Sequence, residues 1–584
     1  MGSFLLTAQI KKMPLKDLLP KIEALHKVSF SYADSYIKDV LVSFDYKLLS
    51  LEETLVILSN KTQLEFKQLN NTFITIRNAT AQAHFKFEEL EEVIITNYLT
   101  SGISKNVTGS ITIKPNEFSI LPGLIAPDVL QAVQALPGII SVDETVSNIN
   151  IRGGTHDQNL ILYDGIRMYQ SGHFFGLISA FNPYLAKDIA VLKNGTNAQY
   201  GGSVSGVIDI QLDDDISQQK SYGFGLDLIS IDGFTILPIG AQTTLQIAAR
   251  RSLTDIANTP TYTQYFKRVF QDSDFTNTNE STITKNEDFY FYDTSIKILH
   301  DFSKNNKLRL NFISIGNTLN YQEASTVNTM EEDFESQLQQ RSLGTRLSYE
   351  HQFNDQTSAT AQLHYSSYKI DATNNDLLNE QRLIQQNEVI DDGFHLDIRH
   401  VISPNITLSS GFDFSEIGIT NFEDVNNPEF RSFIKNVLHT YAMYSEFMFS
   451  SGDDDMVLTM GLRSHYFEKF ERYTFEPRLH YSQRFLKAFR VELSGELKSR
   501  WILANNSTIP IMTSKQTTLG LQYNKHKVLI SLEGYLKEVN GITTRSQGFQ
   551  NQFQFVNATG SYFSKGIDIL ISKQFHNFTS WLSY

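Results

Sequence analysis

The sequence of 584 residues contains no cysteine, no long apolar run and no excess of positive charge. The absence of cysteine excludes disulfide scaffolds and zinc sites built from thiolates. No window approaches the roughly 18 consecutive apolar residues that a membrane-spanning helix needs. The 64 acidic residues outnumber the 50 basic ones, for a net charge of −14, which argues against a nucleic-acid-binding protein.

Motifs of common enzyme sites are missing as well. The chain has no H-E-x-x-H, no G-x-x-x-x-G-K and no G-x-S-x-G. The run Gly201–Gly206 looks like a nucleophile elbow, but Val204 stands at its centre, so we interpret it as a tight turn. The 14 histidines are spread along the chain, whereas a metal site needs a cluster of ligands. We therefore expect no enzyme, no cofactor and no metal site.

Aromatic residues, in contrast, are abundant, with 26 tyrosines and 41 phenylalanines. The mean hydropathy of −0.24 is typical of a soluble protein. A membrane β-barrel gives a similar value, because only alternate residues of its strands face lipid. No secretory signal is visible, since the short apolar patch Phe4–Leu6 has no basic region before it. A barrel interpretation therefore requires that a signal peptide was lost.

From about residue 221 onward, apolar and polar residues alternate. The alternation runs from Leu343 to Phe353, continues after a turn at 354–356, and recurs on both sides of 403–405. Runs of about ten alternating residues are typical of membrane barrels. The alternative is a soluble β-sandwich, which has shorter strands and loops of similar length at both ends.

The lengths of the connections favour the barrel. Short turns are predicted at 236–241, 303–306, 354–356, 403–405, 451–455, 486–488, 524–526 and 574–577. Longer polar connections are predicted at 256–286, 322–342, 371–391, 416–436 and 540–560. Short connections at one end and long ones at the other are the pattern of outer-membrane barrels. The turns predict about 16 strands.

The stretch Ser147–Gly206 is the most informative part of the chain. It contains I-R-G, L-Y-D-G-I, I-x-V-L-K-N-G and Q-Y-G-G-S-V-S-G-V-I in this order. These motifs resemble the plug domain of TonB-dependent outer-membrane receptors. A predicted helix over Asp128–Leu136, within A-P-D-V-L-Q-A-V-Q-A-L-P-G-I, is similar to the first helix of that domain.

The resemblance implies a mainly β fold. We expect a transmembrane antiparallel β-barrel plugged by a small α+β domain and preceded by a small periplasmic α+β domain. The expected domains are 1–78 (N-terminal), 79–96 (linker and coupling segment), 97–212 (plug) and 213–584 (barrel). Family barrels have about 22 strands, so we expect a chain truncated at its C-terminal side; a finished barrel of about 16 strands is the alternative.

Residues 4–77 have the pattern β-α-β-β-α-β-β. Apolar residues recur at helical spacing after Pro14, Ser50 and Glu53 form a predicted capping box, and Asn70-Asn71 predicts a hairpin. The order resembles the short N-terminal domain shared by secretins and some TonB-dependent receptors. That resemblance implies a periplasmic domain that contacts an anti-sigma regulator.

A short extended segment follows the polar linker: Glu91, Glu92, Val93, Ile94, Ile95 and Thr96. It resembles the TonB box, which the periplasmic protein TonB grips by adding a strand. Its β-branched residues favour the extended state, and no proline blocks backbone pairing. The alternative is an ordinary edge strand.

The resemblance also implies ligand contacts at the outer apex of the plug: Arg152, Tyr169, Gln170, His173 and Phe174. These side chains offer aromatic faces and hydrogen-bonding groups that suit an organic chelate. Alternatively, Phe174 and Phe175 pack against the barrel wall.

Together these features predict a TonB-dependent receptor in the outer membrane, in contact with its lipid, with the N-terminal domain in the periplasm. We expect it to import a scarce ligand, a ferric siderophore-type chelate, with energy coupled through TonB. A glycan, cobalamin or peptide is an alternative ligand. A signalling or adhesion protein that does not transport is an alternative function, and deletion of Glu91–Thr96 would distinguish the two. An outer-membrane enzyme is disfavoured by the missing catalytic motifs.

Overall fold

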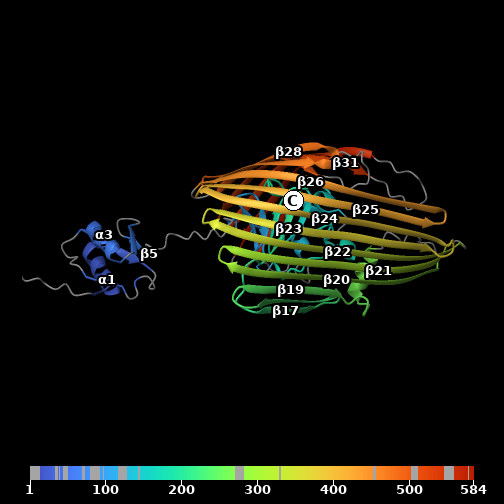
Figure 1. The fold of residues 1–584 in the computed structure, drawn as a ribbon, viewed down its shortest axis with the longest axis horizontal. Coiled ribbons are helices and arrows are strands. Elements are labelled where there is room, and N and C mark those ends of the chain that lie inside the picture. Colours follow the sequence, from blue (N-terminus) through green and yellow to red (C-terminus); the bar gives the residue numbers. More distant parts are fainter. Residues whose placement is uncertain are drawn as a thin grey trace, which may run out of the picture. The chain divides into compact units, whose positions relative to one another are not determined.

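The computed structural model describes residues 13–32, 37, 40–43, 50–62, 64–68, 73–78, 93–95, 98–115, 117, 128–142, 145–269, 282–327, 330–451, 455–500, 511–544, 558–575 and 578–584. The chain divides into two compact units, Met1–Glu89 and Leu90–Tyr584 (Figure 1). Within the described residues, no helix has both the length and the apolar character that a membrane crossing requires.

The N-terminal unit is a small α+β fold. Its described elements are β1 (Met13–Pro14), α1 (Leu15–His26), β2 (Ser29–Ser31), β3 (Leu41–Val42), α3 (Leu51–Thr62), β4 (Leu64–Gln68) and β5 (Phe73–Asn78). This is the predicted order of elements. Strand β5 lies between β2, to which it is parallel, and β4, to which it is antiparallel.

Both helices of this unit follow from the sequence pattern. Leu15, Leu19 and Ile22 lie on one face of α1 and are fully or nearly fully buried, as the helical spacing predicts. The backbone N–H of Ser50 donates to Glu53 Oε2 at 2.9 Å, and the backbone N–H of Glu53 donates to Ser50 Oγ at 3.3 Å. This reciprocal pair is the predicted capping box at the start of α3.

The second unit contains an inner domain built on a seven-stranded sheet. The strand order is β12-β11-β16-β15-β8-β7-β6. The strands are β6 (Val93–Ile95), β7 (Ile103–Asn106), β8 (Ile111–Ile113), β11 (Leu160–Tyr163), β12 (Ile166–Arg167), β15 (Ala186–Leu192) and β16 (Val207–Leu212). Strand β6 is an edge strand, and it pairs with β7 in antiparallel register.

Smaller elements complete the inner domain. They are α4 (Val129–Gln134), β9 (Ile139–Ser141), β10 (Ile149–Ile151), η1 (His156–Gln158), β13 (Gly172–His173), η2 (Phe174–Gly176) and β14 (Ile178–Ser179). Helix α4 begins after Asp128, whose carboxylate accepts hydrogen bonds from the backbone N–H groups of Leu130 and Gln131, both at 2.9 Å. The helix lies within the predicted range 128–136. It starts after Asp128 because an Asp cap satisfies the free N–H groups of the first turn.

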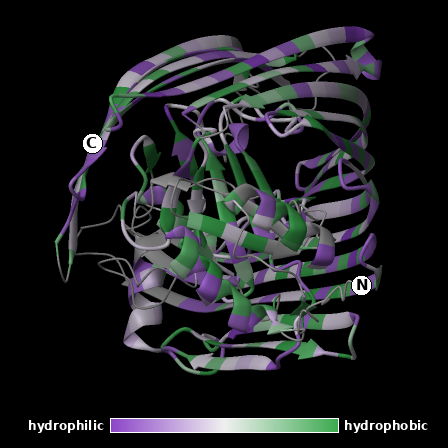
Figure 2. Ribbon diagram, turned by 90° about the vertical axis from the view of Figure 1, so that its left-hand side faces the viewer, coloured by the Kyte–Doolittle hydropathy of each residue, from purple (hydrophilic) through white to green (hydrophobic). Residues whose placement is uncertain are grey.

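A 17-stranded antiparallel sheet curves around the inner domain (Figures 1 and 2). Its strands pair in chain order, from β17 to β33. The first nine are β17 (Ser221–Leu226), β18 (Ser230–Pro238), β19 (Thr243–Ser252), β20 (Thr282–Ser303), β21 (Asn306–Val327), β22 (Met330–Asn354), β23 (Thr357–Asp376), β24 (Gln381–Ser403) and β25 (Ile406–Asn426). The others are β26 (Glu429–Ser450), β27 (Met456–Phe467), β28 (Arg472–Phe485), β29 (Phe489–Arg500), β30 (Met512–Lys525), β31 (Val528–Thr544), β32 (Ala558–Gln574) and β33 (Thr579–Ser583).

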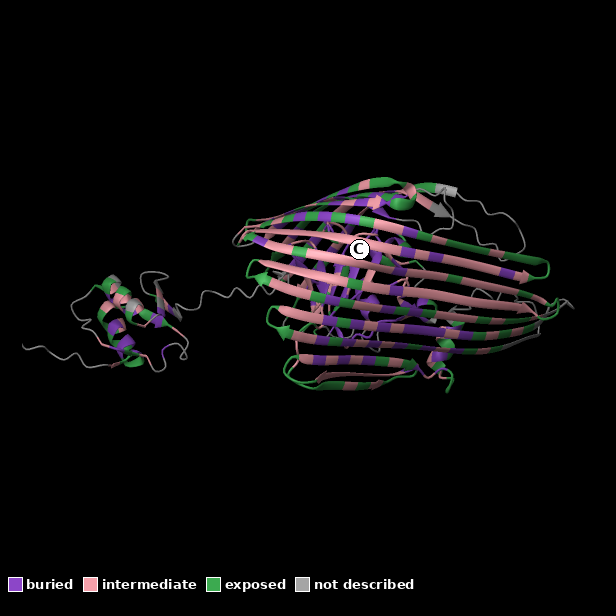
Figure 3. Cartoon of the chain, viewed as in Figure 1, coloured by how far each residue is buried: buried purple, intermediate pink, exposed green. Residues whose placement is uncertain are grey.

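Hydropathy and burial alternate along several strands of this sheet (Figures 2 and 3). On β22, Leu343 and Leu347 are 37% and 40% exposed and point away from the inner domain, whereas Ser342 and Ser348 are 3% and 4% exposed and point toward it. A sheet with its apolar face outward and its polar face inward is the arrangement of a membrane barrel, in which lipid covers the outer face.

All eight predicted short turns lie between consecutive strands, and β17 adds one strand before the first of them. The long connections predicted at 322–342, 371–391 and 416–436 are wrong. These residues belong mostly to strands β21 to β26, and the tight connections are 327–330, 376–381 and 426–429. Strand β22 is 25 residues long, far more than the roughly 9–11 that span a bilayer. The first part of β22, residues 330–342, is mostly polar, and for this reason the sequence pattern resembled a loop. The connection predicted at 256–286 instead contains a helix, α5 (Pro260–Val269).

Candidate functional site

The inner domain fills the space enclosed by the sheet. Its apolar core contains Tyr163, Phe181 and Ile189 and extends to wall residues such as Leu529 and Leu570, all of which are at most 5% exposed. The rings of Tyr163 and Phe181 stack at 5.5 Å. A packed core that continues into the wall leaves no room for free passage along this side of the inner domain.

Buried ion pairs join the inner domain to strands β29, β31 and β32. Lys105 Nζ lies 2.7 Å from Glu492 Oε2 and 2.6 Å from Glu533 Oε1. Arg152 pairs with Glu533 and Asp568. Burial alone would lower the pKa of Lys105, but the two glutamates raise it above its ordinary value. These cations therefore stay charged and hold the inner domain to the wall.

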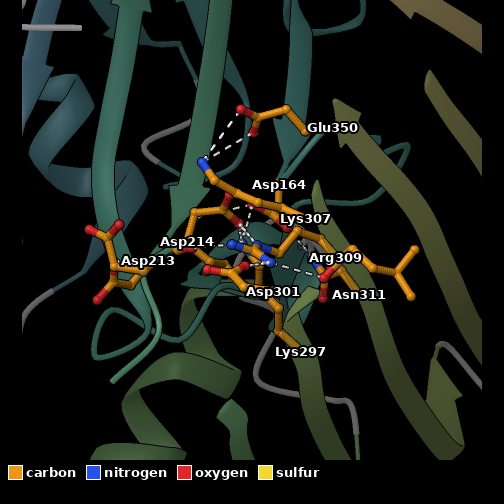
Figure 4. A network of polar contacts seen from close by, with 12 residues as sticks. Asp164, Asp213, Asp214, Lys297, Asp301, Lys307, Arg309, Asn311 and Glu350 are labelled. Atoms are coloured by element: carbon orange, nitrogen blue, oxygen red, sulfur yellow. Dashed lines mark hydrogen bonds and ion pairs between the residues drawn. The ribbon is translucent and has the colours of Figure 1, made fainter. Parts of the chain in front are cut away.

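A second anchor lies at the turn between β11 and β12. Asp164, with a positive φ of 48°, accepts from Lys297 Nζ and from Asn311 Nδ2, both at 3.1 Å (Figure 4). Lys297 also lies 2.9 Å from Asp214, in the segment that leads to the sheet. The next residue is Gly165, with φ of 79°. This explains the D-G pair of the L-Y-D-G-I motif, because a turn with two positive φ angles favours Asp or Asn followed by Gly.

A cavity of about 520 Å³, here called the side cavity, lies between the inner domain and strands β21 to β29. Its lining is polar and contains charges of both signs. The lining includes Arg346, Arg463 and His364 and the carboxylates Asp391, Asp397 and Asp413. Asp391 lies 3.5 Å from His364, and Asp413 pairs with Arg463. The cavity is thus a polar space along one side of the inner domain.

A second cavity, of about 420 Å³, lies at the apex of the inner domain and is here called the apex cavity. Residues of both the inner domain and the wall line it, among them His156, Asp157, Tyr169, Gln170, Phe175, Gln340, Tyr368 and Arg500. Gln340 and Tyr368 lie on the parts of β22 and β23 that lead to the connections 327–330 and 376–381. The apex cavity therefore lies nearer to the end of the sheet that carries the connections 327–330 and 376–381 than to the end that carries the turn 354–356.

Two of the five predicted ligand contacts line the apex cavity. The hydroxyl of Tyr169 donates to Asp391 Oδ2 at 2.8 Å. Gln170 donates from Nε2 to the carbonyl of Gly172 at 3.0 Å, while its buried Oε1 has no hydrogen-bond partner among the described residues. Burial raises the pKa of the Tyr169 phenol, so the hydroxyl remains a donor. A role of these two side chains in ligand contact stays a prediction.

The structure gives Arg152 and His173 other surroundings. Arg152 is 4% exposed and holds the wall carboxylates described above. His173 is fully buried, its Nδ1 lies 2.8 Å from Asn317 Oδ1, and its Nε2 lies 3.1 Å from Asp293 Oδ2. Burial lowers the pKa of His173. Neither residue lines the apex cavity, because the glycine-rich turns direct both side chains into the wall. Phe174 belongs to η2, and its side chain is outside the described residues.

Several residues at the apex were not predicted. Arg167 directly follows the L-Y-D-G-I motif, so its place next to a turn was a usable signal. Gln340, Tyr368 and Arg500 lie on wall strands, and no motif marks them. Their position depends on the register in which the wall strands pair, such as the pairing of Ser342 with Tyr368.

The predicted coupling segment is partly described. Val93–Ile95 form β6, whereas Glu91, Glu92 and Thr96 lie outside the described residues. Val93 is in register with Asn106, and Ile95 with Lys105. The segment therefore pairs directly with the strand that carries the buried Lys105. The free side of β6 is open among the described strands, because β6 ends the order of the sheet.

Within the described part of the chain, no three His, Asp or Glu side chains are grouped in a way that could hold a metal ion. A comparison with models of protein families decides the identity of the inner domain. The model of the TonB-dependent receptor plug domain matches residues 105–207. These residues are a TonB-dependent receptor plug domain. The match covers β8, β11, β12 and β15 of the seven-stranded sheet, the second half of β7 and the first residue of β16, together with the apex turns.

Solved structures share the fold of plug and sheet. The copper transporter OprC is 14% identical with a TM-score of 0.57, over 82% of this chain and 78% of its own. A mutant of the ferric enterobactin receptor PfeA from Pseudomonas aeruginosa is 13% identical with a TM-score of 0.58, over 85% and 80%. FpvA from P. aeruginosa, in a complex with iron-bound pyoverdine, is 12% identical with a TM-score of 0.53, over 98% and 84%.

A comparison with the sequences of curated proteins gives no match. The chain thus has the plug and barrel fold of TonB-dependent outer-membrane receptors, a family of receptors and transporters and not of enzymes. At these identities the solved structures establish the fold alone, and the ligand has to be argued from the site.

Proposed function

We propose that this protein is an outer-membrane receptor that imports a ferric siderophore-type chelate with energy supplied through TonB. The observation that carries the proposal is the separation of two features on one plug domain. The apex cavity lies toward one end of the sheet, and the edge strand β6 lies beside Lys105, whose partners Glu492 and Glu533 are close to the short turns at the other end. A ligand site and a pulling site on opposite ends of a plug suit energy-dependent import.

In the proposed function, transport requires the plug to move. The plug core continues into the wall, and its buried ion pairs span the interface, so passage of a chelate requires work on the plug. The outer membrane has no nucleotide energy source, and we infer that the work arrives as a pull on residues 91–96. Strand addition to the free edge of β6 would let TonB grip this segment through backbone hydrogen bonds.

The ligand class is inferred from the lining of the apex cavity. Tyr169, Gln170 and Tyr368 offer aromatic faces and hydrogen-bonding groups, which suit an organic chelate. Receptors with the same fold are named for ferric enterobactin and are seen with iron-bound pyoverdine, which supports an iron chelate over the alternatives of a glycan, cobalamin or peptide.

Substitution of Ile94 by proline tests the coupling step. Proline removes a backbone donor and disfavours strand pairing, so Ile94→Pro should abolish uptake of radiolabelled ferric chelates while binding to whole cells persists. The matched control is Ile94→Val, which keeps a β-branched residue and should transport normally. Uptake by Ile94→Pro at the wild-type rate would contradict import through this segment and favour a protein that signals or adheres without transport.

We further propose that the N-terminal unit reports ligand binding to an anti-sigma regulator. Support comes from its separate core of Leu15, Leu19, Ile22, Leu58 and Ile74, which makes it a unit of its own. Deletion of residues 1–78 should leave uptake intact and abolish ligand-induced transcription of the receptor gene, measured with a reporter fusion. Induction that survives the deletion would contradict the signalling role.

A further inference from the structure

Two arginines mark the junction between the apex cavity and the side cavity. Arg167, at the end of β12, and Arg500, at the end of β29, are the two residues that line both cavities. One belongs to the plug and the other to the wall. A ligand that enters the apex cavity and leaves through the side cavity would pass between these guanidinium groups.

Arg500 is unusual because it is buried without an ion-pair partner among the described residues; the carboxylate of Asp157, which also lines the apex cavity, attracts it from a longer distance. It is 7% exposed, and its Nη1 is buried with no hydrogen-bond partner in the described part of the structure. No described carboxylate lies within ion-pair distance of it. A buried guanidinium without a partner is costly for the folded protein, so this arginine contributes little to stability, and its donors remain available to a bound group.

Arg167 is only partly neutralised. Its Nη2 donates to the carbonyl of Gly202 at 2.9 Å, and its Nη1 lies 3.9 Å from Asp391. That carboxylate already accepts hydrogen bonds from Tyr169 and from Ser415 at 2.8 and 3.0 Å. The guanidinium of Arg167 also lies over the Tyr169 ring at 5.3 Å, which fixes its plane. Arg167 therefore shares Asp391 with two other donors and makes only a long ion pair with it.

We propose that Arg167 and Arg500 bind an oxyanion of the ligand, a carboxylate or a deprotonated catechol, at the junction of the two cavities. The inference rests on the proposed function and adds the charge of the substrate. The planar fork of arginine matches two oxygen atoms held side by side, as in these groups. Gln170, whose Oε1 is unpaired at the apex cavity, accepts a hydroxyl or amide N–H of the same ligand.

Direct binding to the purified full-length protein in detergent tests the proposal. The probes are ferric citrate, which carries free negative charge, iron-free citrate, and ferrichrome, a neutral hydroxamate chelate. The wild type should bind ferric citrate or citrate in a calorimetric titration. Arg500→Gln should weaken this binding about 10- to 100-fold, the effect of losing one charge-assisted hydrogen bond, and Arg500→Lys should weaken it less.

Three variants separate a binding role from a structural one. Arg500→Gln removes an unpaired buried charge, so the melting temperature without ligand should stay constant or rise. Arg382→Gln is the charge-matched control, because Arg382 lines neither cavity and pairs with Asp424 at 3.5 Å; its affinity should equal that of the wild type. Gln170→Glu places a carboxylate beside the junction and should also weaken anion binding.

The outcomes distinguish this inference from the proposed function. Equal affinity of the wild type and Arg500→Gln for the anionic probes overturns the oxyanion site. A wild type that binds and imports ferrichrome but binds neither citrate form overturns it as well, yet leaves the receptor function standing. Uptake that is insensitive to Ile94→Pro contradicts the transport function and has no bearing on anion binding.

Discussion

The anchoring of the plug can be tested with two lysines that each bridge two carboxylates. Lys105 is 2% exposed and lies 2.7 and 2.6 Å from Glu492 and Glu533. Lys187 is 48% exposed and lies 3.2 Å from each of Asp213 and Asp215. Loss of one partner from a buried ion pair costs about 3–5 kcal/mol, whereas an exposed pair contributes only about 0–1 kcal/mol. Lys105→Gln should therefore loosen the plug far more than Lys187→Gln.

The absence of cysteine supplies a clean assay. Val133→Cys introduces a thiol into α4, where Val133 is fully buried, so a maleimide reacts only when the plug opens. Because each 1.4 kcal/mol is a factor of ten, Lys105→Gln should raise the labelling rate by about 100-fold or more, and Lys187→Gln by less than about 5-fold. Similar rates in the two variants would refute the reasoning that burial decides the strength of these anchors.

The same thiol reports on two further predictions. Asp209 is buried, and burial raises its pKa above the ordinary value of 3.8. Its charged form therefore destabilises the plug at pH values above 3.8, so Asp209→Asn should slow labelling at pH 7, and this slowing should vanish near pH 4. Asp164→Asn removes the charge paired with Lys297 and should instead accelerate labelling. Burial lowers the pKa of His173 below 6.5, so the unfolded plug takes up the proton more readily and wild-type labelling should accelerate as the pH falls below 6.5; a pH profile of His173→Gln with the same slope would contradict this assignment.

Local sequence signals predicted the plug and the N-terminal unit well. The motifs L-Y-D-G-I and I-x-V-L-K-N-G coincide with β11 and β15 and the turns that follow them, and α4 lies within the helix predicted over Asp128–Leu136. Each of these elements is defined by neighbours in the chain, such as a cap, a tight turn or a glycine. The same locality placed the eight short turns of the sheet.

The upper part of the sheet and the candidate site were less predictable. Polar residues of β22 to β25 beyond the membrane band alternate without an apolar face, and composition alone does not separate such strands from loops. The apex cavity needs Gln340, Tyr368 and Arg500 on three wall strands, so its residues follow from the register of the whole sheet. Arg152 stands next to a glycine turn, but its left-handed backbone conformation, with φ of 49°, directs the side chain to the wall.

The register of β6 connects the coupling segment to the anchors. Ile95 pairs with Lys105, and Lys105 is the residue that holds Glu492 and Glu533. In the proposed function, a pull on residues 91–96 is therefore applied through backbone hydrogen bonds to the strand that carries a buried anchor. Lys105→Gln should lower the work needed to displace this strand, although β6 itself is unchanged. The variant would then admit large antibiotics such as vancomycin even in cells without TonB, and cells that remain as resistant as the wild type would show that the plug stays closed without this anchor.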